Sequence, residues 1–282
     1  PIDIMEGEVR IQAYVLKEGI PSNTVEMEYH VNYPGTPVIF EDEVVEKAVK
    51  EQVQNELGYM PDVVTDIDCW KLEYINIDGE RNRICLNDLK WLPNLYSLSI
   101  YTYDSGKIID YTPLQYCKNL SNLYLSNGTL ENLDFVNNMP NLRNLDVRNN
   151  KISDISALKG CTKLENLEIT ENPVSDISVA LANGNIKYLQ ISDYQMPDSS
   201  EMKNLESLEI TGFHFDSARL AKLTGLKELS IQVDWEQVYA SGDYRAPVLK
   251  DISFVKYLPQ LTYLNLAGVS DPEQLQFLYE LE

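Results

Sequence analysis

The sequence predicts an α/β solenoid, in which short parallel strands alternate with tight helical turns. The pattern of segment 142–150, Leu-x-x-Leu-x-Val-x-x-Asn, returns in conservative form 22 residues later, in segment 164–172. Apolar residues at its first, fourth and sixth positions recur from nine starting points: Leu72, Leu95, Leu120, Leu142, Leu164, Ile186, Leu205, Leu226 and Leu261. Such self-similarity is the signature of a repeat architecture, in which each turn buries its core only against its neighbours.

A second apolar register predicts the other half of each turn. The residues nine, six and three places before a start are apolar, as in Ile155, Leu158 and Cys161 before Leu164. A spacing of three is typical of a short 3₁₀ turn, which we expect behind the strands. An aspartate or asparagine stands ten residues before five of the starts: Asp110, Asn132, Asp154, Asp176 and Asp251. Such side chains can cap the free amides of a turn, so we expect this row to be structural rather than catalytic.

Two elements are predicted ahead of the repeats. Residues 9–15 and 25–31 alternate between apolar and polar side chains, which predicts a β-hairpin. Residues 42–57 carry apolar side chains along one side of a helix, and Gly58 is well placed to end it. This helix would cap the first turn, which otherwise exposes its core. We therefore expect a hairpin region at 1–40, a helical cap at 41–62 and the solenoid at 63–282.

The charge of the chain excludes several classes of partner. Its 282 residues carry a formal net charge of −21. Nucleic acid requires clustered lysine and arginine, and an anionic membrane surface would repel this protein. No apolar run approaches the roughly 18 residues that cross a bilayer, so we expect no membrane insertion. The chain begins at Pro1 with no signal peptide, and we expect that something upstream has been removed.

Residues for metal or acid–base chemistry are scarce. The four cysteines are Cys69, Cys85, Cys117 and Cys161, and they show no C-x-x-C spacing. With only two histidines in the chain, we expect neither a zinc site nor another cofactor. Three of the cysteines stand three residues before a start, which makes them core fillers. No Ser-His-Asp order and no glycine-rich phosphate loop is present, so the sequence indicates a protein that is not an enzyme.

The segments 151–158, Lys-Ile-Ser-Asp-Ile-Ser-Ala-Leu, and 174–178, Val-Ser-Asp-Ile-Ser, carry a family resemblance. They resemble the bacterial leucine-rich repeats of the internalin type, over roughly residues 60–282. The resemblance implies a right-handed horseshoe with parallel strands on the concave face, 3₁₀ or short helical turns on the convex face, and a helical N-terminal cap. It also implies a ladder of asparagines that bond backbone groups between turns, here Asn150 and Asn172. Gly128 and His214 stand in that register elsewhere, so we expect His214 to be a structural substitute rather than a general base.

Period two places the residues between the apolar strand positions on the concave face. The middle and later repeats thereby bring together carboxylates and tyrosines: Tyr124, Asp146, Glu168, Tyr188, Glu209 and Glu228. Such a row could be a glycosidase pair, a calcium site, a solvated surface or a protein-contacting patch. An open sheet offers a glycosidase no deep pocket and offers calcium few ligands.

The longest interval between starts, 35 residues from Leu226 to Leu261, contains an extra loop. That loop carries Trp235, Tyr239 and Tyr244, and further aromatic residues follow strands at Tyr101, Tyr194 and Phe213. Exposed aromatic side chains supply contact area at low entropic cost, although they can equally pack a loop onto the body. We expect Trp235 and Tyr244 to reach the concave face from its rim.

These observations favour a non-enzymatic scaffold that binds a protein ligand through its concave face and aromatic rim. We expect it to be secreted or displayed on a cell surface. One alternative is a structural spacer or repeat stalk within a larger surface protein. Another is a carbohydrate-binding module that uses Trp235 and the tyrosines as sugar platforms.

Overall fold

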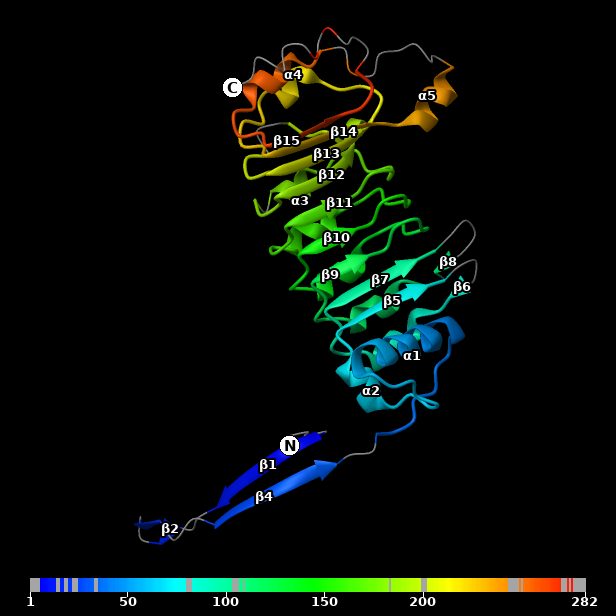
Figure 1. Cartoon of the computed structure of the whole chain (residues 1–282), viewed down its shortest axis with the longest axis vertical. Helices are drawn as coiled ribbons and strands as arrows, with labels where there is room; N and C mark the ends of the chain where they lie inside the picture. Colours follow the sequence, from blue (N-terminus) through cyan, green and yellow to red (C-terminus); the bar gives the residue numbers. More distant parts are fainter. Residues whose placement is uncertain are drawn as a thin grey trace.

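A parallel sheet of nine strands forms the body of the described protein (Figure 1). The computed structural model describes residues 6–13, 16–17, 20–21, 25–32, 35–79, 83–102, 107–108, 110–182, 184–198, 202–242, 249, 251–269, 273 and 275. The nine strands are β5 (Tyr74–Asp78), β7 (Ser97–Tyr101), β9 (Asn122–Tyr124), β10 (Asn144–Asp146), β11 (Asn166–Glu168), β12 (Tyr188–Ser192), β13 (Ser207–Gly212), β14 (Glu228–Val233) and β15 (Tyr263–Leu266). They stack in chain order, so each repeat adds one strand.

The strand pairing confirms the predicted repeat register. Leu145 pairs with Leu123 on one side and with Leu167 on the other, and all three side chains are buried. The fourth position of every repeat aligns in the same way from β5 to β15. One face of each strand therefore faces a continuous core, while the intervening residues form the opposite face of the sheet, which we call the concave face.

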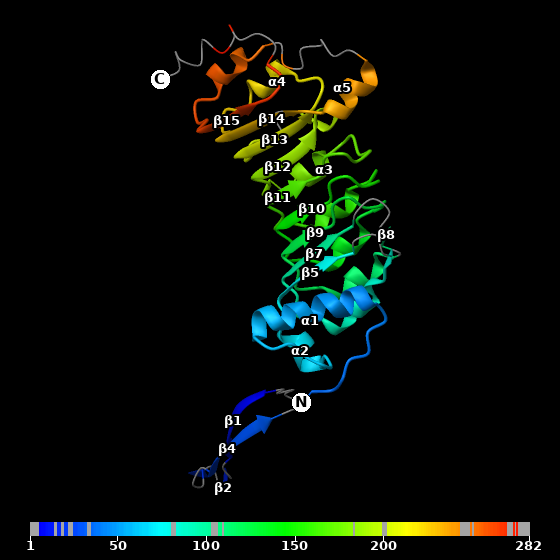
Figure 2. The ribbon, with the colours of Figure 1, turned by 45° about the vertical axis from the view of Figure 1, so that its right-hand side comes forward.

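Short turns cover the core on the other side of the strands, as Figure 2 shows. They are η1 (Leu86–Trp91), η2 (Thr112–Tyr116), η3 (Asp134–Asn138), η4 (Ser156–Gly160), α3 (Ser178–Leu181), η5 (Asp193–Gln195), α4 (Ser217–Leu220) and η7 (Ser253–Tyr257), beside the short pair β6 (Arg83–Ile84) and β8 (Lys107–Ile108). Ile155, Leu158 and Cys161 are buried there, as their spacing predicts. Together, the strands and turns give the predicted leucine-rich-repeat horseshoe.

The predicted capping aspartates and asparagine bind the amides at the start of these turns. Asp154 Oδ1 accepts from the backbone N–H of Ser156 at 2.7 Å. The other four predicted caps accept from the residue two places on, at 2.8 to 3.2 Å. Asp216 does the same for Ala218 at 3.0 Å, although the sequence analysis did not include it. The acidic row is therefore structural, as predicted.

The asparagine ladder is confirmed and continues further than predicted. Asn150 Nδ2 donates to the carbonyl of Leu125 at 2.7 Å, and Asn172 Nδ2 donates to the equivalent carbonyl of Val147 at 2.8 Å. In the next turn Gln195 takes over, donating to Ile169 O at 3.2 Å. Gln195 stands nine residues after its repeat start, Ile186, whereas the two asparagines stand eight residues after theirs. The extra methylene of glutamine lets its amide still reach the equivalent carbonyl, that of Ile169.

His214 does not continue this ladder, so the expected structural role for its side chain is wrong. The side chain is exposed and its ring lies against Phe213, with 4.5 Å between ring centroids. Asp193 holds this turn instead, because its Oδ2 accepts from the backbone N–H groups of Phe213 and His214 at 2.7 and 2.6 Å. His214 stands nine residues after Leu205, one place beyond the eight-residue offset of Asn150 and Asn172 from their starts.

A helix precedes the first strand of the sheet. Helix α1 (Glu43–Leu57) begins after Asp42, whose carboxylate accepts from two amides of its first turn, and it ends at Gly58 in the left-handed conformation. Its buried valines pack toward β5, the outermost strand at this end. A short helix α2 (Asp66–Lys71) follows, with Thr65 and Asp68 forming a capping box. That α1 acts as a cap stays a prediction.

The predicted hairpin is confirmed as an antiparallel pair. Strand β1 (Glu6–Ala13) pairs with β4 (Val25–Asn32), and the short strands β2 (Leu16–Lys17) and β3 (Ile20–Pro21) pair between them. The hairpin precedes α1 in the chain (Figure 1). Between α1 and the hairpin, the backbone N–H groups of Glu41 and Asp42 donate to the buried carboxylate of Asp88, which fixes this segment to η1.

Candidate functional site: the concave face

The six strand residues predicted as a site lie on one continuous surface. Asp146 pairs with Tyr124 and Glu168, and Gln190 pairs with Glu168 and Glu209. These five residues therefore form one row across the neighbouring strands β9 to β13. Tyr188 lies in the adjacent column, in register with Asn166 and Ser207, and Glu228 follows it on β14. A depression of 440 Å³ opens among these side chains, with Tyr124, Asp146, Glu168, Tyr188 and Glu228 in its lining.

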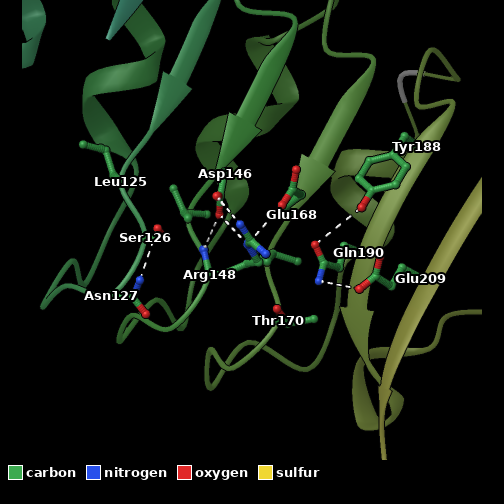
Figure 3. Close-up of polar contacts among 12 residues, drawn as sticks. Leu125, Ser126, Asn127, Asp146, Arg148, Glu168, Thr170, Tyr188, Gln190 and Glu209 are labelled. Carbon is green, nitrogen blue, oxygen red and sulfur yellow. Dashed lines mark hydrogen bonds and ion pairs between the residues drawn. The ribbon is translucent and has the colours of Figure 1, made fainter. Parts of the chain in front are cut away.

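Arg148 is the residue of this site that the sequence analysis missed. Its guanidinium donates to both carboxylate oxygens of Asp146, at 2.9 and 2.7 Å, and forms an ion pair with Glu168 at 3.0 Å (Figure 3). Asp146 is almost fully buried, whereas Arg148 remains partly exposed. Arg148 stands six residues after Leu142, and reading one more column of the concave face would have found it.

Arg148 does not neutralise the negative potential completely. Burial raises the pKa of Glu168, and the nearby charges of Asp146 and Glu209 raise it further against the opposing effect of Arg148. Burial, with added repulsion from the carboxylates, also raises the pKa of the Tyr124 and Tyr188 hydroxyls. Both tyrosines therefore stay neutral hydrogen-bond donors across the ordinary pH range.

The other two carboxylates, Glu209 of the row and Glu228 of the adjacent column, accept hydrogen bonds from neutral donors. Glu209 Oε1 accepts from the amides of Gln190 at 3.0 Å and Gln232 at 2.7 Å, and Gln190 in turn faces the Tyr188 hydroxyl (Figure 3). Glu228 accepts from the hydroxyl of Ser207 at 3.0 Å. These contacts hold the carboxylates in place while leaving their charge on the surface.

Two further columns run beside this row. The side-chain amides of Asn122, Asn144 and Asn166 form a hydrogen-bonded ladder across β9, β10 and β11. At the start of the strands, five charged residues alternate in sign: Arg143, Glu165, Lys187, Glu206 and Lys227. Ion pairs link Glu165 with Arg143 and with Lys187, and link Glu206 with Lys227 at 2.6 Å. The cations of this edge are therefore already engaged by neighbouring carboxylates.

The predicted aromatic rim is only partly visible. Trp235 is the first residue of helix α5 (Trp235–Ser241), which follows β14 (Figure 1). Its side chain is 55% exposed, and the centroids of the Trp235 and Tyr239 rings are 6.4 Å apart. Tyr244 lies outside the described residues. Phe213 packs against Val233 and Val238 in a small cluster. That Trp235 reaches the ligand of the concave face stays a prediction.

Some of the other aromatic side chains hold the backbone in place, and others are exposed on the surface. The Tyr194 hydroxyl donates to the backbone of Asn172 at 2.8 Å, which anchors its loop to the preceding turn. Tyr74, Tyr96 and Tyr101 are exposed around β5 and β7, and Tyr96 and Tyr101 lie near Tyr124. The tyrosines thus extend the concave surface toward its N-terminal end.

The part of the chain that the structure describes holds neither a metal-binding cluster nor a membrane-spanning helix. No group of three or more histidine, cysteine, aspartate or glutamate side chains there has a geometry that could hold a metal ion. Within the same residues, no helix is both long enough and apolar enough to cross a bilayer.

Comparisons with known proteins agree with the repeat fold. Residues 140–183 match the family described as Leucine Rich repeats (2 copies). Internalin C2 (inlC2) of Listeria monocytogenes has a similar structure, with a TM-score of 0.60 and 22% identity, over 82% of this chain and 97% of that one. An internalin (inlF) of the same organism gives 0.52 and 22%, over 88% and 83%. None of the curated proteins matches the sequence. The chain thus contains leucine-rich repeats and has a fold similar to that of these internalins.

Proposed function

We propose that this protein is a non-enzymatic scaffold that binds another protein through its concave face. Leucine-rich-repeat folds are typical of protein-binding scaffolds, because stacked repeats create an extended concave surface. The observation that carries the proposal is the 440 Å³ depression between Tyr124 and Tyr188. Tyrosine is enriched among the residues that dominate binding energy at protein interfaces, since it buries a large area at low entropic cost.

The carboxylates of the site support binding better than catalysis. Asp146 is nearly buried and held by two hydrogen bonds from Arg148, and Glu168 shares the same guanidinium. A catalytic carboxyl pair needs one group free to transfer a proton in a pocket that excludes water. Here the ion pairs fix both carboxylates in an open depression, where they can contribute to association rate and specificity.

Because the fold is similar to that of the internalins, we propose that the protein acts outside the cell or on a cell surface. The division into a hairpin region, a helical cap and a solenoid is part of the same proposal. The solenoid would carry the contact surface, and the hairpin at 1–40 would lie apart from it.

Affinity capture with matched variants tests the proposal. The full chain would be immobilised and exposed to extracts, alongside a Tyr124→Ala/Tyr188→Ala variant and a control with Tyr116→Ala and Tyr257→Ala. The control removes two tyrosines that are exposed on the convex turns. We expect the concave variant alone to lose its partner, with a cost of about 2 kcal/mol or more per anchor.

Hydrogen exchange on the captured complex locates the contact. We expect protection on the concave strands β9 to β13. Protection confined to the convex turns, or to the hairpin at 9–32, would contradict the proposed site and favour a spacer role.

A further inference from the structure

The concave face has an uneven distribution of charge that selects the chemistry of its partner. Its central row contains three carboxylates, Asp146, Glu168 and Glu209, with Glu228 in the adjacent column. The guanidinium of Arg148, two residues after Asp146, is the cation that contacts this row. Arg148 is committed to Asp146 and Glu168, whereas Glu209 and Glu228 accept hydrogen bonds from amides and a hydroxyl. The lysines at the strand starts are paired with Glu165 and Glu206. The centre of the face therefore keeps an excess of negative charge.

Two tyrosines flank Asp146 and Glu168, whereas Glu209 and Glu228 lie on the strands beyond Tyr188. Tyr124 on β9 and Tyr188 on β12 are separated by β10 and β11, so their backbones lie about 14 Å apart at the usual strand spacing. Glu168 lies between them in the lining of the depression. Half-buried rings beside carboxylates suit a guanidinium, which can stack on an aromatic face and bind a carboxylate at the same time.

The net charge of the whole chain also acts on a partner at long range. Its net charge of −21 repels a second copy of itself, nucleic acid and other anionic partners, while it attracts and steers a cationic one. An open depression of 440 Å³ accommodates a side chain of a segment that lies across the strands, with other residues of that segment over the amide ladder of Asn122, Asn144 and Asn166.

We propose that the concave face docks a cationic segment of a partner protein, with an arginine side chain seated in the depression lined by Tyr124 and Tyr188, against Glu168 and next to Glu209 on the neighbouring strand β13. This inference rests on the proposed function and specifies the partner's chemistry. It predicts that affinity depends on the charge of the two glutamates, on the rings of the two tyrosines, and on arginine more than lysine.

Fluorescent peptides of twelve residues, alternating glycine with arginine, lysine or glutamate, provide the probe. They would be titrated against the intact chain at 0.15 M salt. We expect the arginine peptide to bind at least about threefold more tightly than the lysine peptide, since only arginine stacks and forms paired hydrogen bonds. We expect no binding of the glutamate peptide.

A charge-matched pair of variants separates local recognition from general attraction. Glu168→Gln/Glu209→Gln removes two charges from the site, and Asp62→Asn/Glu131→Gln removes two exposed charges elsewhere. We expect the first variant to weaken arginine-peptide binding at least about fivefold and the control to change it less than twofold. Equal loss in both variants, or equal binding of arginine and lysine peptides, would overturn the inference. Thermal melting of each variant confirms that it is folded.

The two proposals can fail separately. A captured partner that is lost with Tyr124→Ala/Tyr188→Ala, but is unaffected by Glu168→Gln/Glu209→Gln, would refute the cationic segment and leave the binding scaffold in place. A partner that protects only the convex turns of this protein from hydrogen exchange would refute both proposals.

Discussion

The side-chain amide of Asn172 donates to the backbone carbonyl of Val147, one turn earlier, at 2.8 Å. The same amide also donates to Ile169 O and Thr170 O, and the Asn172 Oδ1 accepts from the backbone N–H of Ile152 at 3.0 Å. Because the side chain is only 1% exposed, water cannot replace these bonds. One residue thus fixes the backbone of two neighbouring turns.

We expect Asn172→Ala to lower the free energy of unfolding by at least about 2 kcal/mol, because several buried backbone groups lose their partners. Chemical denaturation with circular dichroism measures this. The control is Asn119→Ala, which removes one exposed hydrogen bond to Pro93 O and should cost less than about 1 kcal/mol. Equal losses would mean that the ladder does not hold the turns together.

We expect Leu167→Ala to cost about 2–5 kcal/mol, the range for a buried leucine that leaves a cavity. The side chain is fully buried in the middle of the sheet, where each turn is held only by its neighbours. Urea titration of the variant gives the loss. Glu168→Gln, at the next position and on the opposite face, should change stability by less than about 1 kcal/mol. A loss as large as that of Leu167→Ala would contradict the assignment of the two faces.

We expect the buried cysteines to resist modification until the protein unfolds. Burial raises the pKa of the Cys69 and Cys117 thiols to about 12 and that of Cys161 to about 11, and the thiolate is the reactive form. Cys85 is only partly buried. A chromogenic disulfide reagent at pH 8 should therefore modify Cys85 first, and four thiols should titrate in denaturant. Rapid modification of three or more thiols in the folded protein would contradict the core assignment.

Two carboxylates should respond to pH in opposite directions. The folded pKa of Glu168 is raised, so its contribution to stability is present below the unfolded pKa near 4 and is lost as pH rises through the folded value. The folded pKa of Asp176 is lowered by hydrogen bonds from Ser178. Its contribution is present above the unfolded pKa and is lost as pH falls.

Denaturation from pH 3 to pH 7 measures both effects. Relative to the unsubstituted protein, Glu168→Gln should become more stable as pH rises from about 4 to 7, while Asp176→Asn should become less stable as pH rises above about 3. A shift of both variants in the same direction would contradict the two pKa assignments.

The repeat allowed most of the fold to be predicted, because the period-two and period-three spacings specify strand faces and turns independently. Every predicted concave residue that the structure describes in a strand lies in the expected column, since parallel pairing preserves the register from Ser97 to Tyr263. His214 was misassigned because it stands nine residues after Leu205, whereas Asn150 and Asn172 stand eight residues after their starts. The ladder instead continues through Gln195, whose longer side chain a fixed asparagine pattern cannot anticipate.

The candidate site was less predictable than the fold. Sequence columns placed Asp146 and Glu168 side by side, but the shared ion pair with Arg148 depends on how a long side chain folds back across the face. Likewise, the buried state of Asp146 follows from its partners rather than from its position. Loop residues such as Trp235 have no period to fix them, so their orientation lay beyond the sequence pattern.

The amide ladder has a consequence for how a ligand finds its alignment. Asn122, Asn144 and Asn166 present the same side chain at three successive strands, so a ligand that touches only these amides meets identical chemistry after a shift of one repeat. The adjacent row, Tyr124, Asp146 and Glu168, differs at each strand. This row breaks the translational symmetry and leaves a single alignment in which aromatic and charged groups of a ligand all meet their complements.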